Sequence, residues 1–420
     1  MTAAEPDGQR PVVVLVGALD TKAAEYEHLR DRLESSGVRA AVVDVGVLGP
    51  VRADVEVDRR AVAAAAGAEL DALVAAGDRG AAVTAMARGA AAVVARMHAE
   101  GRLHGLLVAG GSGAAHVMSR CAQALPLGCP KVLVSTVVAG DTRPYVGTSD
   151  LVMMHSVVDL TGVDSISAVV LARAADACAG MVFGAVAAPP TAPVPADVVA
   201  CSVLGVTTAG TVAVSGDLRR RGLEVHAFHA NGTGGRCLEA LVRSGLVTAV
   251  ADLTPGEVAD EVCGGAFSAG PGRMEAAGER GVPQVVSTGG LDMVKFGPRE
   301  TLPEAVAGRR LHVHNPAVTL VRTDARECAA IGAVVAEKLN RATGPVEVHV
   351  PLGGWSELSV PGGPFHDPDA DAALVDALRD GLAPRVEVHL HEGDVNDPVF
   401  ATAVAAALAR TVEQDHRPRS

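Results

Sequence analysis

The sequence has few aromatic residues and no cluster of basic residues. Phe, Trp and Tyr make up 2% of its 420 residues, so side chains on which nucleobases stack are nearly absent. The net charge is −13, and such a surface repels phosphate backbones. These absences argue against general nucleic-acid binding.

Cysteines at motif spacing are also missing. The seven cysteines include no C-x-x-C pair. An odd number without framework spacing is typical of reduced thiols, so we predict a cytoplasmic protein. Residues 1–9 are polar and lack the apolar region of a signal peptide. We expect no run long and apolar enough to span a bilayer, and no membrane association.

Two stretches of the chain nearly repeat each other. Gly128–Thr136 (GCPKVLVST) returns, one residue shorter, as Gly281–Thr288 (GVPQVVST). Each reads as a helix end, a tight turn and a short apolar strand that opens into a polar loop. A chain of 420 residues also exceeds what one hydrophobic core supports. We predict an α/β protein of two Rossmann-like domains, with mostly parallel sheets flanked by helices, facing across a cleft.

The domain boundaries follow from the hydrophobic pattern and from one proline-rich segment. Short runs of Val, Leu and Ala predict buried parallel strands at 11–17, 38–45, 104–109, 131–135, 198–205, 223–229, 247–251, 283–287, 310–314, 346–350 and 385–390. Amphipathic patterns in the first half predict helices at 22–36, 58–76, 78–99, 112–124 and 164–183. Four prolines between Ala187 and Pro195 indicate a linker. We therefore predict domains at 1–187 and 197–412, a linker at 188–196 and a disordered tail at 413–420.

Two glycine-containing loops follow predicted strands of the first half. Gly110-Gly-Ser-Gly113 has the composition of an anion-binding nest at a strand-to-helix junction, and we favour ligand binding there. Gly17-Ala-Leu-Asp-Thr-Lys22 places a hydroxyl and an ammonium group at a helix start, where anions are favoured. Asp20 or Thr21 as a plain N-cap is the alternative, and the spacing leaves both open.

The fourth strand opens into Ser135-Thr136 and then Gly140-Asp-Thr-Arg-Pro-Tyr-Val-Gly-Thr148. Asp141 is a candidate Mg²⁺ ligand, and the Arg143 guanidinium fits a phosphate. The alternative is a surface ion pair between these two residues. The position at the carboxyl end of a strand favours a functional role.

The second half repeats the order of strand, glycine-rich turn and helix. We predict substrate contacts from the turn His229-Ala-Asn-Gly-Thr-Gly-Gly-Arg236, that is, from His229, Gly232, Thr233, Gly234, Gly235 and Arg236. His229, Asp292 and His314 are the candidate acid–base residues. His312 and His314 share one strand face, as do His389 and His391, so each pair could provide two ligands to zinc. Because no Cys or Glu stands at a diagnostic spacing as a third ligand, we predict no metal site.

Several motifs together resemble the Tm-one-like ATP-binding domain family, which is named after a plant antiviral resistance protein and has long been catalogued as uncharacterised. The resemblance covers about residues 11–410. Its motifs are Gly17–Lys22, Gly110–Gly113, Gly140–Thr148, Phe228–Gly235, Leu291–Pro298, His312–Pro316 and Glu337–Pro345. Two departures are Ser287-Thr-Gly-Gly290, where Pro-Gly-Ala is expected after the Ser, and Asn231, where Thr is usual.

The resemblance implies a two-domain fold, ATP binding and homodimers. The implied nucleotide contacts are Gly17, Asp20, Thr21, Lys22, Gly110, Gly111, Ser112, Gly113, Thr136, Asp141, Thr142, Arg143 and Thr148. We therefore expect a nucleotide-binding protein, with Mg²⁺ and ATP turnover left open. One alternative is an enzyme that acts on a small acidic metabolite in the interdomain cleft, with ATP as cosubstrate or regulator. Another is a nucleotide-dependent scaffold or regulator without turnover.

Overall fold

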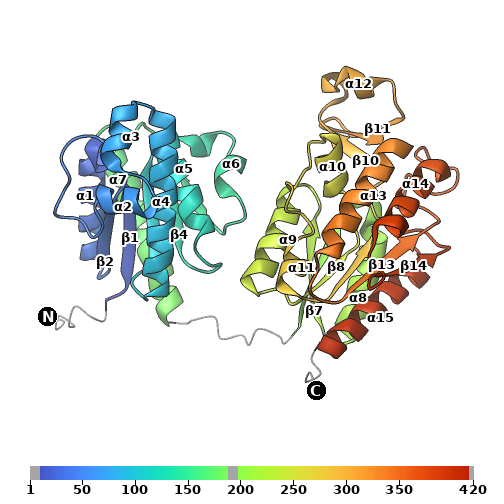
Figure 1. Ribbon diagram of the computed structural model, residues 1–420. Coiled ribbons are helices and arrows are strands. Elements are labelled where there is room, and N and C mark those ends of the chain that lie inside the picture. The colour runs from blue at the N-terminus through green and yellow to red at the C-terminus, as the bar shows by residue number, and fades with distance from the viewer. Residues whose placement is uncertain (1–9, 188–196, 416–420) are drawn as a thin grey trace. The chain divides into compact units, whose positions relative to one another are not determined.

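The computed structural model describes residues 10–187 and 197–415. The chain divides into two compact units, Met1–Ala192 and Pro193–Ser420 (Figure 1). Each unit is a largely parallel sheet flanked by helices, which confirms the predicted fold class. The predicted linker at 188–196 lies outside the described residues.

The N-terminal unit contains one five-stranded parallel sheet in the order β2-β1-β3-β4-β5. Its strands are β1 (Val12–Gly17), β2 (Arg39–Asp44), β3 (Gly105–Gly110), β4 (Lys131–Ser135) and β5 (Val152–His155). The first four were predicted, because parallel strands covered on both faces read as continuous apolar runs. The edge strand β5 was not predicted, since it is short and only partly buried.

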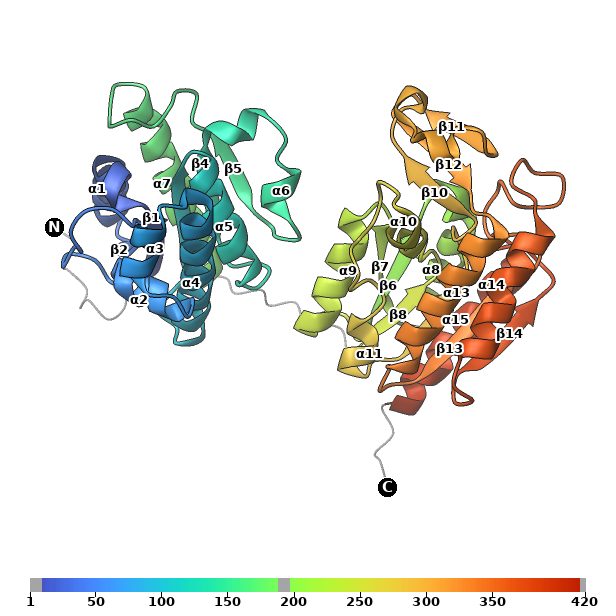
Figure 2. The ribbon, with the colours of Figure 1, turned by 45° about the horizontal axis from the view of Figure 1, so that its top comes forward.

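Helices cover both faces of this sheet (Figure 2). They are α1 (Leu19–Ser35), α2 (Arg59–Ala65), α3 (Leu70–Ala76), α4 (Arg79–Ala99), α5 (Ser112–Gln123), α6 (Arg143–Val146), α7 (Ser167–Ala187) and the 3₁₀ turn η1 (Thr136–Ala139). Alternate residues of β1 point to opposite faces: Val14 packs with α4 and α5, while Leu15 packs with α1 and α7. The single helix predicted at 58–76 is two helices, because the backbone at Gly67 turns left-handed with φ of 68°.

Helix α7 corrects the expectation that no segment is long and apolar enough to span a membrane. The helix has 21 residues, Ser167–Ala187, and an 18-residue window within it has a mean hydropathy of 1.7, which is sufficient by length and composition alone to cross a membrane. A third of that window is buried. Leu171, Cys178 and Val182 lie in the core beneath the sheet. The apolar character of α7 therefore includes a face that packs within the N-terminal unit.

The C-terminal unit contains a six-stranded parallel sheet in the order β14-β13-β9-β8-β6-β7. Its strands are β6 (Val198–Val203), β7 (Glu224–His229), β8 (Ala249–Asp252), β9 (Gln284–Ser287), β13 (Val346–Pro351) and β14 (Glu387–His391). A separate antiparallel sheet holds β10 (Met293–Phe296), β12 (Val318–Arg322) and β11 (Leu311–Asn315). The predicted strand at 310–314 belongs to this small sheet, and its two partners were not predicted.

The helices of the C-terminal unit cover both faces of its large sheet. They are η2 (Gly205–Thr207), α8 (Thr208–Arg220), α9 (Thr233–Ser244), α10 (Glu257–Cys263), α11 (Ala276–Arg280), η3 (Arg299–Thr301), α12 (Glu304–Ala307), α13 (Ala325–Asn340), α14 (Pro368–Gly381) and α15 (Pro398–Asp415). Helix α15 runs past residue 412, because apolar residues up to Val412 pack under the sheet, so the predicted tail began too early. Residues 416–420 lie outside the described residues.

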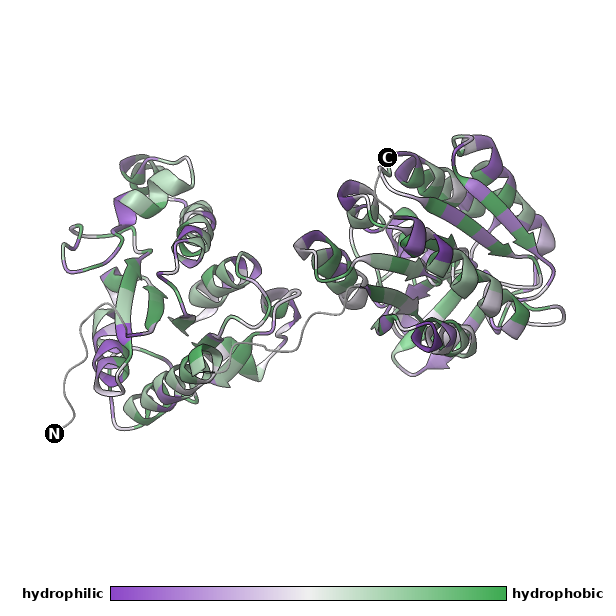
Figure 3. Ribbon diagram, turned by 90° about the horizontal axis from the view of Figure 1, so that it is seen from below, coloured by the Kyte–Doolittle hydropathy of each residue, from purple (hydrophilic) through white to green (hydrophobic). Residues whose placement is uncertain are grey.

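The near-repeat of the sequence corresponds to the same local structure in both units. Gly128, with φ of 85°, precedes β4, and Gly281, with φ of 69°, precedes β9. Both glycines adopt the left-handed backbone that other residues rarely tolerate. Colouring by hydropathy shows largely hydrophobic strands and helices with mixed faces (Figure 3).

Candidate functional site

A cavity of about 590 Å³ opens in the N-terminal unit at the carboxyl ends of β1 and β3. In the strand order β2-β1-β3, the chain reverses direction across the sheet between these two strands. Ligands of open α/β sheets bind in the crevice at this reversal. Four segments and Asp159 line the cavity: Val16–Lys22 without Leu19, Val45–Leu48, Leu73–Met86 in part, and Ala109–Val117 in part. The structure thus brings together the first two loops predicted from the sequence.

The Gly110–Gly113 turn offers unoccupied space and backbone donors. Gly110 has φ of 151°, and a Cβ there would lie 2.7 Å from the Cβ of Ala114. At Gly111 and Gly113 an added Cβ would meet no atom within 4 Å. Helix α5 begins at Ser112, and its N-cap Gly111 supplies no side-chain hydrogen bond. The first N–H groups of an uncapped helix favour an anion, so the turn suits a phosphate.

The absence of a side chain at Gly17 is required by packing and not by the approach of a ligand. A Cβ at Gly17 would lie 2.1 Å from Cζ of Tyr26. The buried Tyr26 hydroxyl donates to the Val16 carbonyl at 2.6 Å and accepts from the Ala109 N–H at 2.9 Å. Burial raises the pKa of Tyr26, so the phenol stays protonated. Tyr26 therefore joins the ends of β1 and β3 beneath the cavity, a role that the sequence analysis missed.

Asp20 holds the cavity wall and does not cap a helix. Its Oδ2 accepts the N–H groups of Val47 and Leu48, both at 2.9 Å. The buried pair of Arg59 and Asp44 fixes the same wall, with Arg59 Nε 2.7 Å from Asp44 Oδ2. Asp44 Oδ1 also accepts the Gly46 N–H at 2.9 Å. These contacts keep residues 46–48 beside the crevice.

Lys22 and Thr21 line the cavity, but both already have partners. The Lys22 ammonium donates to the Leu160 carbonyl and lies 3.8 Å from Glu25 Oε1. The Thr21 hydroxyl donates to the Ala18 carbonyl at 3.4 Å. Lys22 must leave its carbonyl partner before it can contact a ligand.

Arg79 is a cavity residue that the sequence analysis missed. It is exposed, lines the cavity and has no ion-pair partner among residues 10–187 and 197–415. It is the first residue of α4, directly after the N-cap Asp78, whose side chain accepts the Ala81 N–H at 2.9 Å. A cation in the first turn opposes the helix dipole. That mismatch is the sequence signal that could have identified Arg79 as a binding residue.

The third predicted segment, residues 136–148, does not line the cavity. Thr136, Asp141, Thr142, Arg143 and Thr148 are all absent from its walls. Arg143 is 86% exposed and binds Asp141 through two contacts, of 2.9 and 2.7 Å. This guanidinium lowers the pKa of Asp141 to about 2. The geometry is that of the surface ion pair that the sequence left as the alternative.

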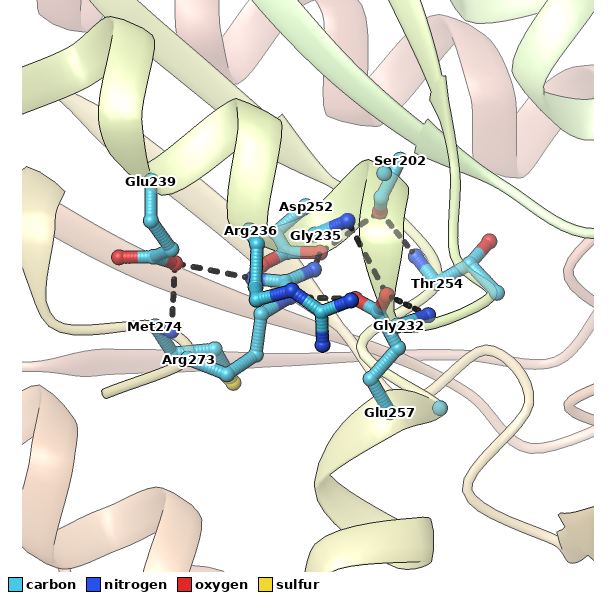
Figure 4. Close-up of polar contacts among 12 residues, drawn as sticks. Ser202, Gly232, Gly235, Arg236, Glu239, Asp252, Thr254, Glu257, Arg273 and Met274 are labelled. Carbon is cyan, nitrogen blue, oxygen red and sulfur yellow. Dashed lines mark hydrogen bonds and ion pairs between the residues drawn. The ribbon is translucent and has the colours of Figure 1, made fainter. Parts of the chain in front are cut away.

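In the C-terminal unit, a carboxylate of the protein itself occupies the turn that was predicted to contact substrate (Figure 4). The N–H groups of Gly232 and Gly235 donate to Glu257 Oε1 at 2.6 and 3.0 Å. A Cβ at Gly235 would lie 1.9 Å from Glu257 Oε2. The N–H groups of these two glycines are therefore already bonded within the protein, which argues against the predicted contact with a substrate.

The other predicted residues of this turn also make internal contacts. Arg236 donates to the Ser268 carbonyl and to the Thr233 hydroxyl, both at 3.3 Å. A Cβ at Gly234 would lie 2.0 Å from the His229 carbonyl oxygen. His229 itself is exposed at the end of β7.

Glu257 belongs to a buried ionic cluster centred on Arg273, which is 1% exposed (Figure 4). Arg273 contacts Glu257 at 2.7 Å, Asp252 at 2.8 Å and Glu239 at 3.4 Å. Ser202 at the end of β6 donates to Asp252 at 2.6 Å. Burial alone would lower the pKa of Arg273, but the three carboxylates outweigh it and raise the pKa well above its ordinary value. Side chains of the protein thus occupy the chain reversal between β6 and β8.

Two of the three candidate acid–base residues, Asp292 and His314, lie apart. Asp292 is fully buried, and its Oδ2 accepts the Ser356 hydroxyl at 2.6 Å. Asp292 also accepts the Thr323 N–H through its carbonyl, whereas His314 lies beside the Val318–Thr319 end of the same small sheet. Asp292 and His314 therefore lie at opposite ends of that sheet. Of the two histidine pairs, His312 packs edge-on against Phe365, and His389 and His391 lie beside His349.

Comparisons with known proteins agree on one family. Residues 11–186 match the N-terminal domain, and residues 196–412 the C-terminal domain, of Uncharacterised protein family (UPF0261). A UPF0261 protein of Clostridium tetani is 40% identical over 403 residues, which are 96% of this chain and 99% of that protein. The ToMV resistance protein Tm-1(GCR237) of Solanum lycopersicum is 40% identical over 330 residues, which are 78% of this chain and 44% of the tomato protein.

Among solved structures, a UDP-N-acetylglucosamine 2-epimerase from Rickettsia bellii aligns with 97% of this chain and 97% of its own. The sequence identity is 8% and the TM-score is 0.21. From a similarity at this level we infer nothing about function.

We predict that Arg273→Met strongly destabilises the C-terminal unit, by about 3–5 kcal/mol, because three buried carboxylates would lose their cation. The only tryptophan, Trp355, is buried in this unit, so urea unfolding followed by its fluorescence reports on this unit. Arg220→Met is the control, since Arg220 is 72% exposed and pairs with Asp217 at 3.0 Å on the surface. Equal midpoints for the two variants would contradict the structural role of Arg273.

Proposed function

The chain belongs to Uncharacterised protein family UPF0261, and on that premise we propose that its N-terminal unit binds ATP in the 590 Å³ cavity. The observation that carries the proposal is the open chain reversal between β1 and β3. There the uncapped start of α5 and the unpaired Arg79 line the same cavity. Both favour a polyanion.

The cavity also suits the rest of a nucleotide. Its volume lies within the ~300–1,000 Å³ of small-molecule sites. The walls include the aliphatic side chains of Leu73, Val74, Val83 and Met86, which provide an apolar surface for a base. No aromatic side chain lines it, so the base would be held by aliphatic packing. The arrangement supports phosphates at α5 and Arg79, with the base against the α3–α4 side.

Two exposed carboxylates at the cavity accept only one N–H group each. Asp78 accepts the Ala81 N–H and Asp159 accepts the Leu160 N–H, in both cases through Oδ1. Asp20, by contrast, accepts two N–H groups. Since Mg²⁺ is bound through one or two carboxylates plus phosphates, Asp159 and Asp78, rather than Asp141, are the ligands that we propose for it.

We predict that Gly111→Val lowers ATP affinity by about tenfold or more, because its side chain would fill the space that a phosphate needs. The backbone at Gly111 has φ of −83°, and an added Cβ meets no protein atom within 4 Å, so the fold should tolerate the change. Gly184→Val on α7 is the control, since Gly184 is also open but lies outside the cavity. Calorimetric titration with ATP measures both. Unchanged affinity in the Gly111 variant would exclude this turn as the phosphate site.

We predict that Arg79→Ala lowers ATP affinity by about 10- to 100-fold, which corresponds to ~1.5–3 kcal/mol for a charged hydrogen bond. Binding of adenosine should be unchanged, because it carries no phosphate. Arg88→Ala on the same helix is the matched control, as Arg88 donates to the Ala66 carbonyl and does not line the cavity. An equal loss for adenosine and ATP would show that Arg79 acts on the fold rather than on phosphate.

Two alternatives concern what binding achieves. An enzyme acting on a small acidic metabolite predicts that ATP is consumed and a second compound changes. A scaffold or regulator predicts binding without turnover. Because Asp292 and His314 lie at opposite ends of the small sheet, the structure favours no particular reaction. Mass-spectrometric profiling of a cell extract incubated with the protein, with and without ATP, separates the two alternatives.

A homodimer in the cytoplasm remains part of the proposal. Exposed apolar side chains on and near α7, including Val157 at 64% and Val169 at 59%, are consistent with a covered surface. We predict a mass twice the 42.4 kDa of the chain in light scattering. A monomer at all micromolar concentrations would contradict the dimer and leave the nucleotide site unaffected.

A further inference from the structure

One face of the edge strand β14 and its neighbour β13 carries an unusual set of polar residues. The two strands pair in parallel, with Glu347 opposite Glu387 and His349 opposite His389. His391 lies two residues further along β14, on the same face. The opposite face of β13, with Val346, Val348 and Val350, packs in the core. Three imidazoles and two carboxylates thus share one small area of the sheet.

The ligand atoms of three of these residues converge. Glu347 Oε2 lies 3.3 Å from His349 Nε2 and 3.3 Å from His389 Nε2. The three atoms all lie within 4.8 Å of one another. Atoms that bind a tetrahedral zinc ion at ~2.0–2.1 Å are about 3.3–3.4 Å apart. His389 Nε2 is buried without a hydrogen-bond partner, although a carboxylate oxygen is near.

A second imidazole fixes the orientation of the His349 ring. His349 is buried, at 3% exposure. Its Nδ1 lies 3.0 Å from Nε2 of His391, and the two rings stack. If His349 Nδ1–H donates to His391, the lone pair of His349 Nε2 points to Glu347. Metal-binding histidines usually have such a partner on the second nitrogen.

We propose that Glu347, His349 and His389 bind a divalent transition-metal ion, with zinc as the best match and water as the fourth ligand. Two imidazoles and one carboxylate are a common zinc set, and imidazole also suits other late first-row metals. Arg410 contacts Glu347 Oε2 at 3.4 Å and would have to move away, which its 57% exposure permits. His391 is a positioning residue, since it acts through His349.

The position of the site indicates a role in the sheet rather than in a reaction. Glu347 and His349 are the second and fourth of the six residues of β13, and His389 is the third of the five residues of β14, so the three ligands lie along the face of the strands. Ligand crevices of such sheets lie at the carboxyl ends. An ion here would link the edge strand β14 to its neighbour β13, independently of the nucleotide cavity.

No metal site was predicted from the sequence, because the third ligand for His389 and His391 was expected near them in the chain. The ligands come instead from β13, about forty residues earlier, and become neighbours only through strand pairing. The pattern Glu-x-His on one strand and Glu-x-His-x-His on the next is the signal that was available.

The test is calorimetric titration of the full-length, chelator-treated protein with Zn²⁺. We expect one ion per chain. His389→Ala and Glu347→Gln should each weaken binding by more than about 100-fold, and His391→Gln by about 10- to 100-fold, as is typical of second-nitrogen partners. His226→Ala should leave the Zn²⁺ affinity unchanged, since His226 on β7 pairs with Glu224 at 2.6 Å and is not one of the proposed ligands.

Trp355 fluorescence establishes that each variant is folded, and His389, at 37% exposure, is preferred to the buried His349 for this reason. Absence of Zn²⁺ binding by the wild-type chain would overturn the proposal. Binding that survives both His389→Ala and Glu347→Gln would overturn it as well, because the ion would then lie elsewhere. Co²⁺ in place of Zn²⁺ should give the visible absorption of a tetrahedral site, lost in the same two variants.

Discussion

The arrangement of the C-terminal unit depends on one buried guanidinium. Arg273 cannot remain in the interior without compensating charge, and Asp252, Glu257 and Glu239 provide it. Each carboxylate also fixes backbone. Glu257 orders the Gly232–Gly235 turn, and Glu239 accepts the N–H of Met274, whose φ of 68° is rare for a residue with a side chain. The end of β8, the start of α10 and the turn before α9 are therefore fixed by a single cluster.

Both units have the same order of strand, glycine-containing turn and helix, but they differ at the point where the strand order reverses. In the N-terminal unit, Asp44 and Arg59 pair to one side and hold residues 46–48 as a wall, so the crevice between β1 and β3 stays open. In the C-terminal unit, the corresponding region between β6 and β8 is filled by Asp252, Ser202 and Arg273. In the N-terminal unit the reversal is therefore open to an anion from outside, as proposed above. In the C-terminal unit it is filled by carboxylates of the protein.

Sequence patterns predicted those features that depend on local chemistry. Buried parallel strands appeared as apolar runs, and the glycines before β4 and β9 appeared as turns, because both are determined by neighbouring residues. The loops at Gly17–Lys22 and Gly110–Gly113 were placed together by the rule that strand ends of one sheet share an edge.

What the sequence did not reveal depends on contacts between distant segments. Glu257 lies over twenty residues from the turn it occupies, and nothing near Gly235 indicates it. The absence of a side chain at Gly17 is explained by the ring of Tyr26. Arg143 and Asp141 were expected to contact a ligand, but they form the exposed ion pair that was the alternative. The strands β10 and β12 were missed because their short runs adjoin loops and pair with each other rather than with the large sheet.

The Tyr26 hydroxyl joins the end of β1 to that of β3 beneath the 590 Å³ cavity. The walls of the cavity come from other segments. Residues 46–48 are held by the carboxylates of Asp20 and Asp44, and the start of α4 also lines the cavity. Substitutions in these walls would change the shape of the cavity without removing the Tyr26 hydrogen bonds beneath it, so the two parts can vary independently.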